Sequence, residues 1–280
     1  MSDNNSYSQE LELGRRRRAG LTLGGFALIA VVVLVALVVW LLGRGLAPDQ
    51  PTPAIPLAPG GVAPGAATPA SGGWDVAAET ALAAAPMVQF PESAVYPHPL
   101  TTDTAGPPLR LPTPTQTAGR VVPGGFPGTP EGAVAQLAEL EKIGQLGGDP
   151  AGYAAAYDSI ALPGAPAATS TGVYLSLQVI RGRAGFPATG MVPDLTFTVD
   201  PVAGLIKGTT DGGRYAVVCV LGQLTAGING RSTSAGGADC QAMRYVNGDW
   251  RISPGAAAAA PSDAWPGTAE AVRAGYRAVS

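Results

Sequence analysis

The chain has 280 residues and a formal net charge of −3, which results from 17 basic and 20 acidic side chains. This near balance predicts no broadly basic surface for binding phosphates, so we expect no direct contact with nucleic acid. The length accommodates one domain of ordinary size together with non-globular segments.

The N-terminal part predicts a single membrane span. Residues 19–43 are 25 residues without a charge, and as an α-helix they would extend about 37 Å, enough to cross the hydrocarbon core. Four basic residues precede this span: Arg15, Arg16, Arg17 and Arg18. Only Arg44 follows it closely, so the charge bias predicts a cytoplasmic tail over residues 1–18 and places the rest of the chain on the outer side of the cell membrane.

A cleaved signal peptide is the alternative interpretation of this segment. Its apolar region is usually shorter, however, and residues 43–48 show no clear small-residue cleavage pattern. The uncleaved span is the better fit, and it makes membrane lipid the first expected partner.

Two segments that lack periodic patterns follow the span. Residues 44–73 contain seven prolines and almost no large apolar residue, which predicts a Pro-rich linker. Residues 74–120 place single large apolar side chains between prolines. They form either an extended arm that docks on the following domain or a continuation of the linker, and the pattern leaves both alternatives open.

Residues 121–280 predict an extracytoplasmic α+β domain that begins with helices. Thr129-Pro130 supplies a hydroxyl at the N-cap and a proline at the first helical position, which predicts a helix to about residue 143. Asp149-Pro150 repeats this start signal for a second helix that ends before Pro163. One face of the second helix carries three large apolar residues: Tyr153, Tyr157 and Ile160.

The segment over residues 171–181 fits two periodicities. Its apolar residues alternate as in a strand, but a subset also recurs at helical spacing, and we favour a helix. Residues 195–199, 203–210 and 214–225 predict strands, with a Gly-rich turn at 211–213.

The last strands predict a tight hairpin. Asn247-Gly248 is the preferred pair for a two-residue type I′ turn, which would place Tyr245 opposite Trp250. Four residues would then share the core-facing side of this hairpin: Met243, Tyr245, Trp250 and Ile252.

Cys219 and Cys240 are the two cysteines of the chain, and both lie in the part expected outside the cytoplasm, where a disulfide persists. If Asn229-Gly230 is also a two-residue turn, Cys219 lies opposite Cys240 in a non-hydrogen-bonded pair, where side chains come closest. The alternative keeps the disulfide but leaves residues 226–238 as a loop without a regular ladder. Two cysteines and one distant histidine do not predict a zinc site.

The sequence contains no recognisable catalytic arrangement. The single histidine, His98, lies between two prolines, a setting typical of a solvated loop. Glu139 and Glu141 are two residues apart on a predicted helix, so we interpret them as solvated charges on different faces. Because no nucleophile, base and orienting acid can be assembled, we expect no enzyme activity and no cofactor.

The order of these parts resembles a known family. The string GGFPGTPEGAVA at residues 124–135 and NGDWRI at residues 247–252, placed after a span and a Pro-rich spacer, resemble actinobacterial membrane-anchored proteins of conjugative elements. Those proteins are in turn similar to the bitopic inner-membrane subunit of type IV secretion systems. The resemblance implies a curved antiparallel sheet with helices packed on its concave face, the cystatin-like or nuclear-transport-factor-like cone. The cysteine pair and the Gly-rich loop depart from this pattern.

Members of that family are non-catalytic scaffolds. The resemblance therefore implies a single-pass assembly subunit of a conjugative DNA-transfer or secretion apparatus, with other membrane-complex subunits and further copies of itself as partners. The alternative is a membrane-anchored binding module for a small ligand or a cell-wall component. Four aromatic residues would line its pocket unless they simply form the core: Tyr153, Tyr157, Tyr245 and Trp250.

Overall fold

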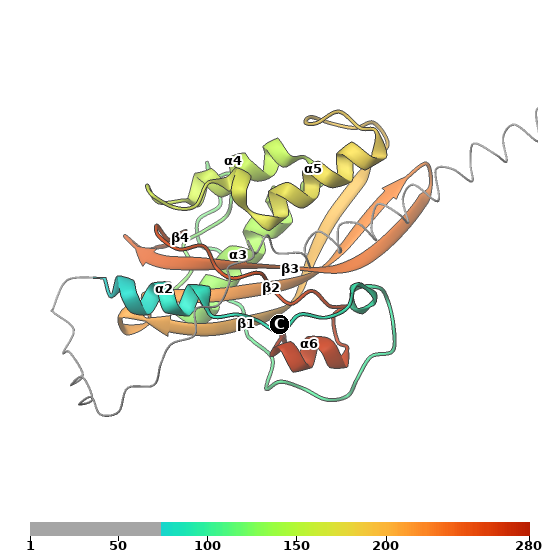
Figure 1. Ribbon diagram of the computed structural model, residues 1–280. Coiled ribbons are helices and arrows are strands. Elements are labelled where there is room, and N and C mark those ends of the chain that lie inside the picture. The colour runs from blue at the N-terminus through green and yellow to red at the C-terminus, as the bar shows by residue number, and fades with distance from the viewer. Residues whose placement is uncertain (1–73) are drawn as a thin grey trace, which may run out of the picture.

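The computed structural model describes residues 74–280 (Figure 1). The cytoplasmic tail, the membrane span and the Pro-rich linker expected over residues 1–73 lie outside the described residues. Between residues 74 and 280, no helix combines the length and the apolar character needed to cross a bilayer.

The domain is α+β, with a five-stranded antiparallel sheet and helices on both of its faces. The helices are α2 (Val76–Ala84), α3 (Pro130–Gly144), α4 (Pro150–Ile160), α5 (Gly172–Ala184) and α6 (Ala269–Ala274). The strands are β1 (Thr196–Thr210), β2 (Tyr215–Ile228), β3 (Arg231–Val246), β4 (Asp249–Ile252) and β5 (Arg277–Ala278), in the order β4-β3-β2-β1-β5. Short 3-10 turns connect them: η1 (Glu92–Val95), η2 (Leu146–Gly148), η3 (Ala168–Ser170) and η4 (Asp211–Gly213).

The helix starts predicted from the sequence are confirmed. Thr129 caps α3 by accepting the amide of Gly132, and the Asp149 side chain accepts the amide of Ala151 at the start of α4. Each of these helices has proline at its first position, where the missing N–H has no intrahelical partner to lose. The segment that fitted two periodicities is the helix α5, which begins at the N-cap Thr171.

The two hairpins have the predicted register. Tyr245 pairs with Trp250 across the Asn247-Gly248 turn, and Cys219 pairs with Cys240 across the turn at Asn229-Gly230. Both asparagines have positive φ, 52° at Asn229 and 53° at Asn247, as type I′ turns require. Residues 226–238 therefore continue the ladder of β2 and β3 and do not form an irregular loop.

The prediction of two separate strands at 195–199 and 203–210 is wrong. A single strand, β1, runs through both segments, with register shifts between Pro201 and Ala203 and between Ile206 and Gly208. Proline has no N–H for the ladder, so the chain bulges beside Pro201 and pairing with β2 resumes beyond it. Figure 1 shows the long strands bending at their far ends toward α5.

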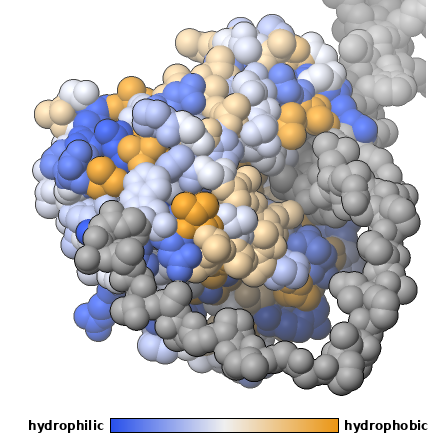
Figure 2. All heavy atoms as spheres, turned by 60° about the vertical axis from the view of Figure 1, so that its left-hand side comes forward, coloured by the Kyte–Doolittle hydropathy of each residue, from blue (hydrophilic) through white to orange (hydrophobic). Residues whose placement is uncertain are grey.

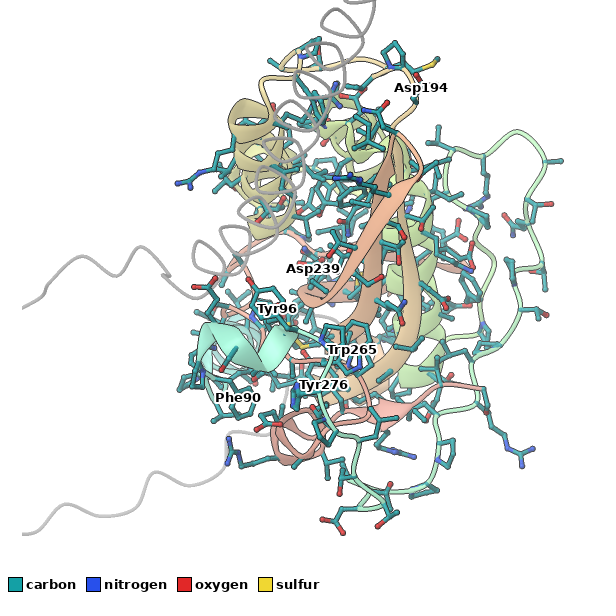
Figure 3. All side chains as sticks on the ribbon, turned by 90° about the vertical axis from the view of Figure 1, so that its right-hand side faces the viewer. Phe90, Tyr96, Asp194, Asp239, Trp265 and Tyr276 are labelled. Atoms are coloured by element: carbon teal, nitrogen blue, oxygen red, sulfur yellow. A yellow bond between two sulfur atoms is a disulfide. The ribbon has the colours of Figure 1, made fainter. Side chains whose placement is uncertain are left out.

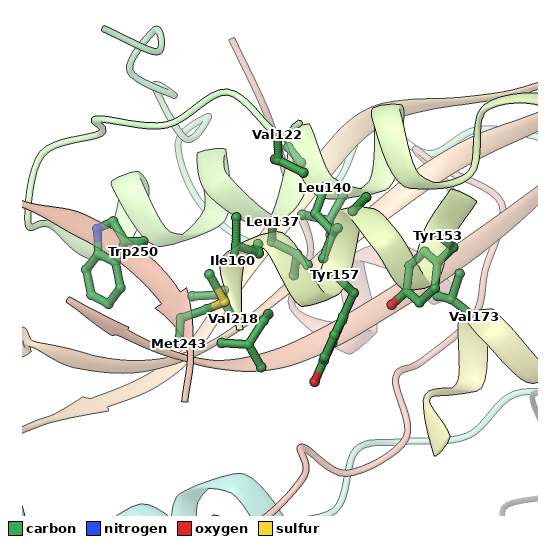
Figure 4. Packing of buried hydrophobic residues seen from close by; sticks show 14 of the residues in the cluster. Val122, Leu137, Leu140, Tyr153, Tyr157, Ile160, Val173, Val218, Met243 and Trp250 are labelled. Atoms are coloured by element: carbon green, nitrogen blue, oxygen red, sulfur yellow. The ribbon is translucent and has the colours of Figure 1, made fainter. Parts of the chain in front are cut away.

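One face of the sheet is covered by α3, α4 and α5 (Figure 4). Val218 and Val220 of β2 and Met243 of β3 point into this core, where they meet Leu137 and Tyr157. Helix α3 comes so close to β1 that a Cβ on Gly204 would lie 2.8 Å from a methyl carbon of Val134. Glycine at this position therefore permits the close approach of helix and strand.

The opposite face is covered by the arm and by the C-terminal segment. Tyr215, Val217 and Leu221 of β2 point to this side, alternating with the residues that face α3. Helix α2 packs there, and the Tyr215 hydroxyl donates to the Glu79 carbonyl at 3.2 Å. Figure 3 shows the labelled side chains of this region: Phe90, Trp265 and Tyr276.

Of the two alternatives for residues 74–120, the structure has the docked arm. The expectation that it is extended is wrong for Val76–Ala84, which form the helix α2. Met87 and Phe90 pack against the cluster around the cysteines, and Val95 is buried against Ala235 of β3. Further along, Leu109 exchanges backbone hydrogen bonds with residues 278 and 280, which adds the arm to the β5 edge. The second face of the sheet is thus covered in part by residues that precede the predicted domain boundary at 121, together with the C-terminal segment.

Large apolar side chains that remain exposed are spread over several elements. Within residues 74–280 they include Val76, Leu100, Leu146, Leu175 and Met191. Figure 2 shows one face, on which hydrophobic residues lie among polar ones. Scattered exposure of this kind is normal for a protein surface and does not define a binding site.

Candidate functional site

The candidate site centres on Glu141, which lies in the last turn of α3 and is 3% exposed. The interpretation of this residue as a solvated charge is wrong. Helix α3 lies between the sheet and the other helices, so nearly its whole circumference is buried. Only Glu139 keeps the expected partly exposed position, where it pairs with Lys142.

A second carboxylate meets Glu141 from the sheet. Asp239, marked in Figure 3, is on β3 and is 6% exposed. Because side chains alternate along a strand, Asp239 points to the helix-covered face while its neighbour Cys240 points to the other. Two amides hold the carboxylates in place: Gln241 Nε2 donates to Asp239 Oδ2 at 2.8 Å, and Gln145 Nε2 donates to Glu141 Oε2.

The electrostatics of this pair favour protonation. Burial raises the pKa of Glu141 well above its ordinary value, and the adjacent Asp239 charge raises it further. Burial also raises the pKa of Asp239 to about 6, although hydrogen bonds from Gln241 and with Glu141 oppose the shift. Two adjacent buried carboxylates cannot both be ionised at low cost, so one proton shared between them is the stable state near neutral pH.

Nothing in the described part of the chain neutralises the pair with a positive charge. The ion pairs formed within residues 74–280 include neither Glu141 nor Asp239. Glu141 Oε1 also accepts no hydrogen bond from an N–H or O–H group of these residues. The carboxyl of Asp239 is its polar neighbour, and that contact is favourable only when a proton lies between the two groups.

A small pocket opens beside Glu141, between α3, α5 and the hairpin of β2 and β3. We call it the carboxyl pocket. Its apolar lining includes Val173, Leu177, Ile180, Leu224 and Ala238, and its polar lining includes Glu141, Gln145 and Ser176. The pocket is partly open, and the space within it that a water-sized group can occupy is about 20 Å³, which suits one water molecule.

Tyr153 adds a second buried polar group without a partner. Its ring is 0% exposed and its hydroxyl makes no hydrogen bond within the described residues. Figure 4 shows the ring of Tyr153 beside Val173, which lines the carboxyl pocket. Burial and the charges of Asp239 and Glu141 raise the pKa of this hydroxyl, although an interaction with the Thr171 side chain opposes the shift, so the phenol stays neutral.

The predicted disulfide is present, but it lies on the other face of the sheet. Cys219 and Cys240 are bonded, with 4.0 Å between their Cα atoms. Met87 of the arm places its sulfur 3.7 Å from Cys219 Sγ and 3.5 Å from Cys240 Sγ. The bond thus joins β2 to β3 under the arm and contributes nothing to the carboxyl pocket. The four arginines at 15–18 lie outside the described residues.

The aromatic residues considered as pocket-lining groups are mainly core residues. Tyr153, Tyr157 and Trp250 are fully buried, and Tyr245 is half-buried. Tyr157 donates to the Pro166 carbonyl at 3.0 Å, and the Trp250 indole donates to the Pro127 carbonyl at 2.8 Å. The Tyr245 and Trp250 rings lie 5.4 Å apart, as expected of a cross-strand aromatic pair.

His98 is less solvated than its Pro-His-Pro setting suggested. Its Nδ1 lies 2.8 Å from the Tyr96 carbonyl and its Nε2 lies 3.1 Å from Glu270 Oε2 of α6. Because both ring nitrogens face acceptors, the doubly protonated imidazolium suits this position. These contacts raise the pKa of His98 above its ordinary value.

That Glu141 and Asp239 form a pair was not predicted from the sequence. Glu141 continues the spacing of Val134, Leu137 and Ala138 along one side of α3, a signal that it faces inward. The hairpin register likewise places Asp239 on the side opposite the disulfide. Their meeting depends on how α3 crosses the sheet, which no local pattern specifies.

Comparison with known proteins does not identify the chain. No protein-family model matches it, and neither curated proteins nor solved structures yield a match. Within residues 74–280 no group of three or more His, Cys, Asp or Glu side chains is placed to hold a metal ion.

Proposed function

We propose that this chain is a non-catalytic, single-pass membrane scaffold of a conjugative DNA-transfer or secretion apparatus. In this proposal residues 19–43 anchor it, with the N-terminus in the cytoplasm, and residues 74–280 contact other channel subunits outside. The apolar stretch after four arginines supports the topology. The order of span, Pro-rich linker and α+β domain supports the assignment to a secretion apparatus by resemblance.

One observation carries the scaffold proposal: the sheet is packed on both faces. Helices α3 to α5 fill one face with side chains such as Leu137, Tyr157 and Trp250, and the arm fills the other. Among the described residues the carboxyl pocket leaves space for only a water-sized group. A domain whose interior is filled in this way has no room for a large substrate, so its outer surface is the part that can contact partner proteins.

The proposal also assigns the domain to the nuclear-transport-factor-like fold. An antiparallel sheet whose strands bend toward the helices on one side fits the nuclear-transport-factor-like cone that the resemblance implies. The covering of the opposite face by the arm is an addition to that plan. In this proposal the arm, which follows the Pro-rich linker, packs against the core as part of the same domain.

Co-purification from membranes tests the assembly role. The tagged full-length chain, extracted in mild detergent after crosslinking, is expected to recover a transport ATPase or other channel subunits. The matched control is a chimera that keeps residues 1–73 and replaces residues 74–280 with an unrelated secreted domain. Recovery of no channel component with the wild type, or equal recovery with the chimera, would refute the scaffold proposal.

A C-terminal reporter fusion tests the topology separately. A reporter that works only outside the cytoplasm is expected to be active at residue 280. Changing the four arginines at 15–18 to glutamate is expected to reduce that activity, because the charge bias that orients the span is reversed. Activity of a cytoplasm-only reporter at the same position would refute the proposed orientation.

A second candidate function is a membrane-anchored binding module, and the carboxyl pocket favours it. A buried carboxyl pair beside an accessible space is expensive unless a ligand or a proton compensates it. The pocket admits a small group and excludes a large cell-wall fragment.

A further inference from the structure

The carboxyl pocket combines an apolar wall with buried oxygen atoms that can accept hydrogen bonds. Val173, Leu177 and Ile180 of α5 provide an apolar wall, and Glu141 presents a carboxylate oxygen without a donor. Ser176 also lines the pocket, and since its hydroxyl donates to the Gly172 carbonyl at 2.7 Å, its lone pairs remain available as acceptors. The site thus offers acceptors at a buried position next to apolar surface.

Charge balance restricts what can complete this site. Glu141 and Asp239 meet in the interior without a cation from the described residues. Either a proton or an external positive charge must separate the two carboxylates.

We propose that the carboxyl pocket binds a primary ammonium group carried on an aliphatic stem. An ammonium group is close to water in size and has three N–H donors, which matches the space and the surplus of acceptors. The ammonium head alone would fill the water-sized space, and the methylene groups of the stem would lie against Leu177, Ile180 and Leu224 toward the open side of the pocket. A guanidinium or a quaternary ammonium group is larger than the enclosed space.

Binding exchanges one positive charge for another. The ammonium group takes the place of the proton shared by Glu141 and Asp239, and that proton leaves to solvent, so the charge of the site is conserved. Affinity should therefore rise with pH as the pair becomes easier to deprotonate. Gln145 and Gln241 donate to the two carboxylates. The titratable groups that interact with the charge of Asp239 are Tyr153 and Tyr157 on α4, and Asp263 and Tyr276 from the segment after β4.

Two sources can supply this chemistry: a free small amine, or a lysine side chain of a partner protein. The inference extends the second candidate function and does not depend on the scaffold role, because co-purification with channel subunits and amine binding are measured separately. Among residues 74–280 the pocket is partly open, so the proposal includes both sources.

The test is calorimetric titration of the full-length chain in detergent with n-butylammonium. n-Butanol, which has the same stem without the charge, and tetramethylammonium, which has the charge without N–H donors, are the matched ligand controls. A second arm uses a short peptide with one internal lysine and the same peptide with that lysine acetylated. Titration in buffers with different ionisation enthalpies reports the released proton.

The matched variants are Glu141→Gln and Glu139→Gln on the same helix. Glu141→Gln preserves side-chain shape but cannot supply the negative charge, so butylammonium should bind at least about tenfold more weakly. Glu139→Gln should bind as the wild type does, because Glu139 pairs with Lys142 outside the pocket. A further variant, Gly237→Ala, places a Cβ 2.5 Å from Leu224 Cδ1 and should weaken binding by occupying space, without changing the carboxyl pair.

The outcomes separate the alternatives. Binding of butylammonium alone supports a free amine as ligand, and binding of the lysine peptide but not its acetylated form supports a partner side chain. Absence of binding by both ligands, equal binding of n-butanol, or unchanged affinity in both Glu141→Gln and Gly237→Ala would overturn the proposal.

Discussion

Replacing Arg244 with methionine is expected to lower the free energy of unfolding by about 3–5 kcal/mol. Arg244 is 1% exposed, pairs with Glu79 of α2, and lies 3.2 Å from Asp211 through Nη1 and Oδ2. Its guanidinium carbon also stacks 3.7 Å from the centroid of the Trp74 ring. Methionine retains an apolar stem but leaves the buried Glu79 carboxylate without its cation, which is the origin of the loss.

The loss of unfolding free energy in Arg244→Met depends mainly on Glu79. Asp211 keeps a second partner, since Arg214 Nη2 lies 3.0 Å from its Oδ1, whereas Glu79 is 5% exposed and has Arg244 as its ion-pair partner. Glu79→Gln should therefore be less harmful than Arg244→Met, at about 1–3 kcal/mol, because Arg244 keeps Asp211. The double variant should be more stable than the two single effects predict, with a coupling of about 1–3 kcal/mol.

Urea unfolding of the full-length chain, followed by tryptophan fluorescence, measures these free energies. Arg214→Met is the matched control, because Arg214 is mostly exposed and its loss should change stability by less than about 1 kcal/mol. Strictly additive effects of Arg244→Met and Glu79→Gln, or a loss below about 1 kcal/mol for Arg244→Met, would refute the idea that a buried ion pair holds α2 on the sheet.

Three further predictions concern bonds and titrating groups. The Cys219–Cys240 bond closes a loop with a sequence separation of 21 residues. Its reduction should lower the free energy of unfolding by about 3 kcal/mol, according to the chain-entropy relation. An unchanged urea midpoint in the presence of reductant would contradict this. Contacts at both ring nitrogens raise the pKa of His98 above 6.5, so the stability from its pair with Glu270 is present below that pH and is lost as the pH rises through the folded-state pKa. The difference in melting temperature between wild type and His98→Gln should accordingly shrink toward alkaline pH, and a constant difference would count against the pair. Burial raises the pKa of Asp263 to about 7, so the stability that the protonated Asp263 side chain contributes is present at pH 3.8 and below and is lost as the pH rises through 7. Asp263→Asn should therefore flatten the plot of melting temperature against pH in this range. An unchanged plot would be inconsistent with the raised pKa.

Several elements could be predicted because their signals are short in sequence. Thr129 and Asp149 satisfy amides within three residues of themselves, so the starts of α3 and α4 follow from local hydrogen bonding. Asn247-Gly248 selects a turn whose register extends along both strands, so the local sequence is enough to place Tyr245 opposite Trp250. The same counting from Asn229-Gly230 placed Cys219 opposite Cys240, one of the two alternatives for residues 226–238.

Other features required contacts between distant residues. Glu141 faces Asp239 across 98 positions of sequence because α3 crosses the sheet at that point, and no periodicity specifies the crossing. The continuity of β1 past Pro201 depends on β2, which supplies partners on both sides of the bulge. The arm had two open interpretations because its isolated apolar residues gain burial only when the second face of the sheet is present.

By itself the sequence determined an apolar segment preceded by four arginines, the helix starts and the register of the Asn247-Gly248 hairpin, since each depends on residues close together along the chain. The register at Asn229-Gly230 was one of two alternatives until the tertiary structure decided it. The tertiary structure alone decided that the arm closes the second face and that two carboxyls meet beside a small pocket. Burial is the physical reason for the difference. A carboxyl has its ordinary acidity in water, and only the surrounding helices and strands remove that water and make a proton or an ammonium group necessary.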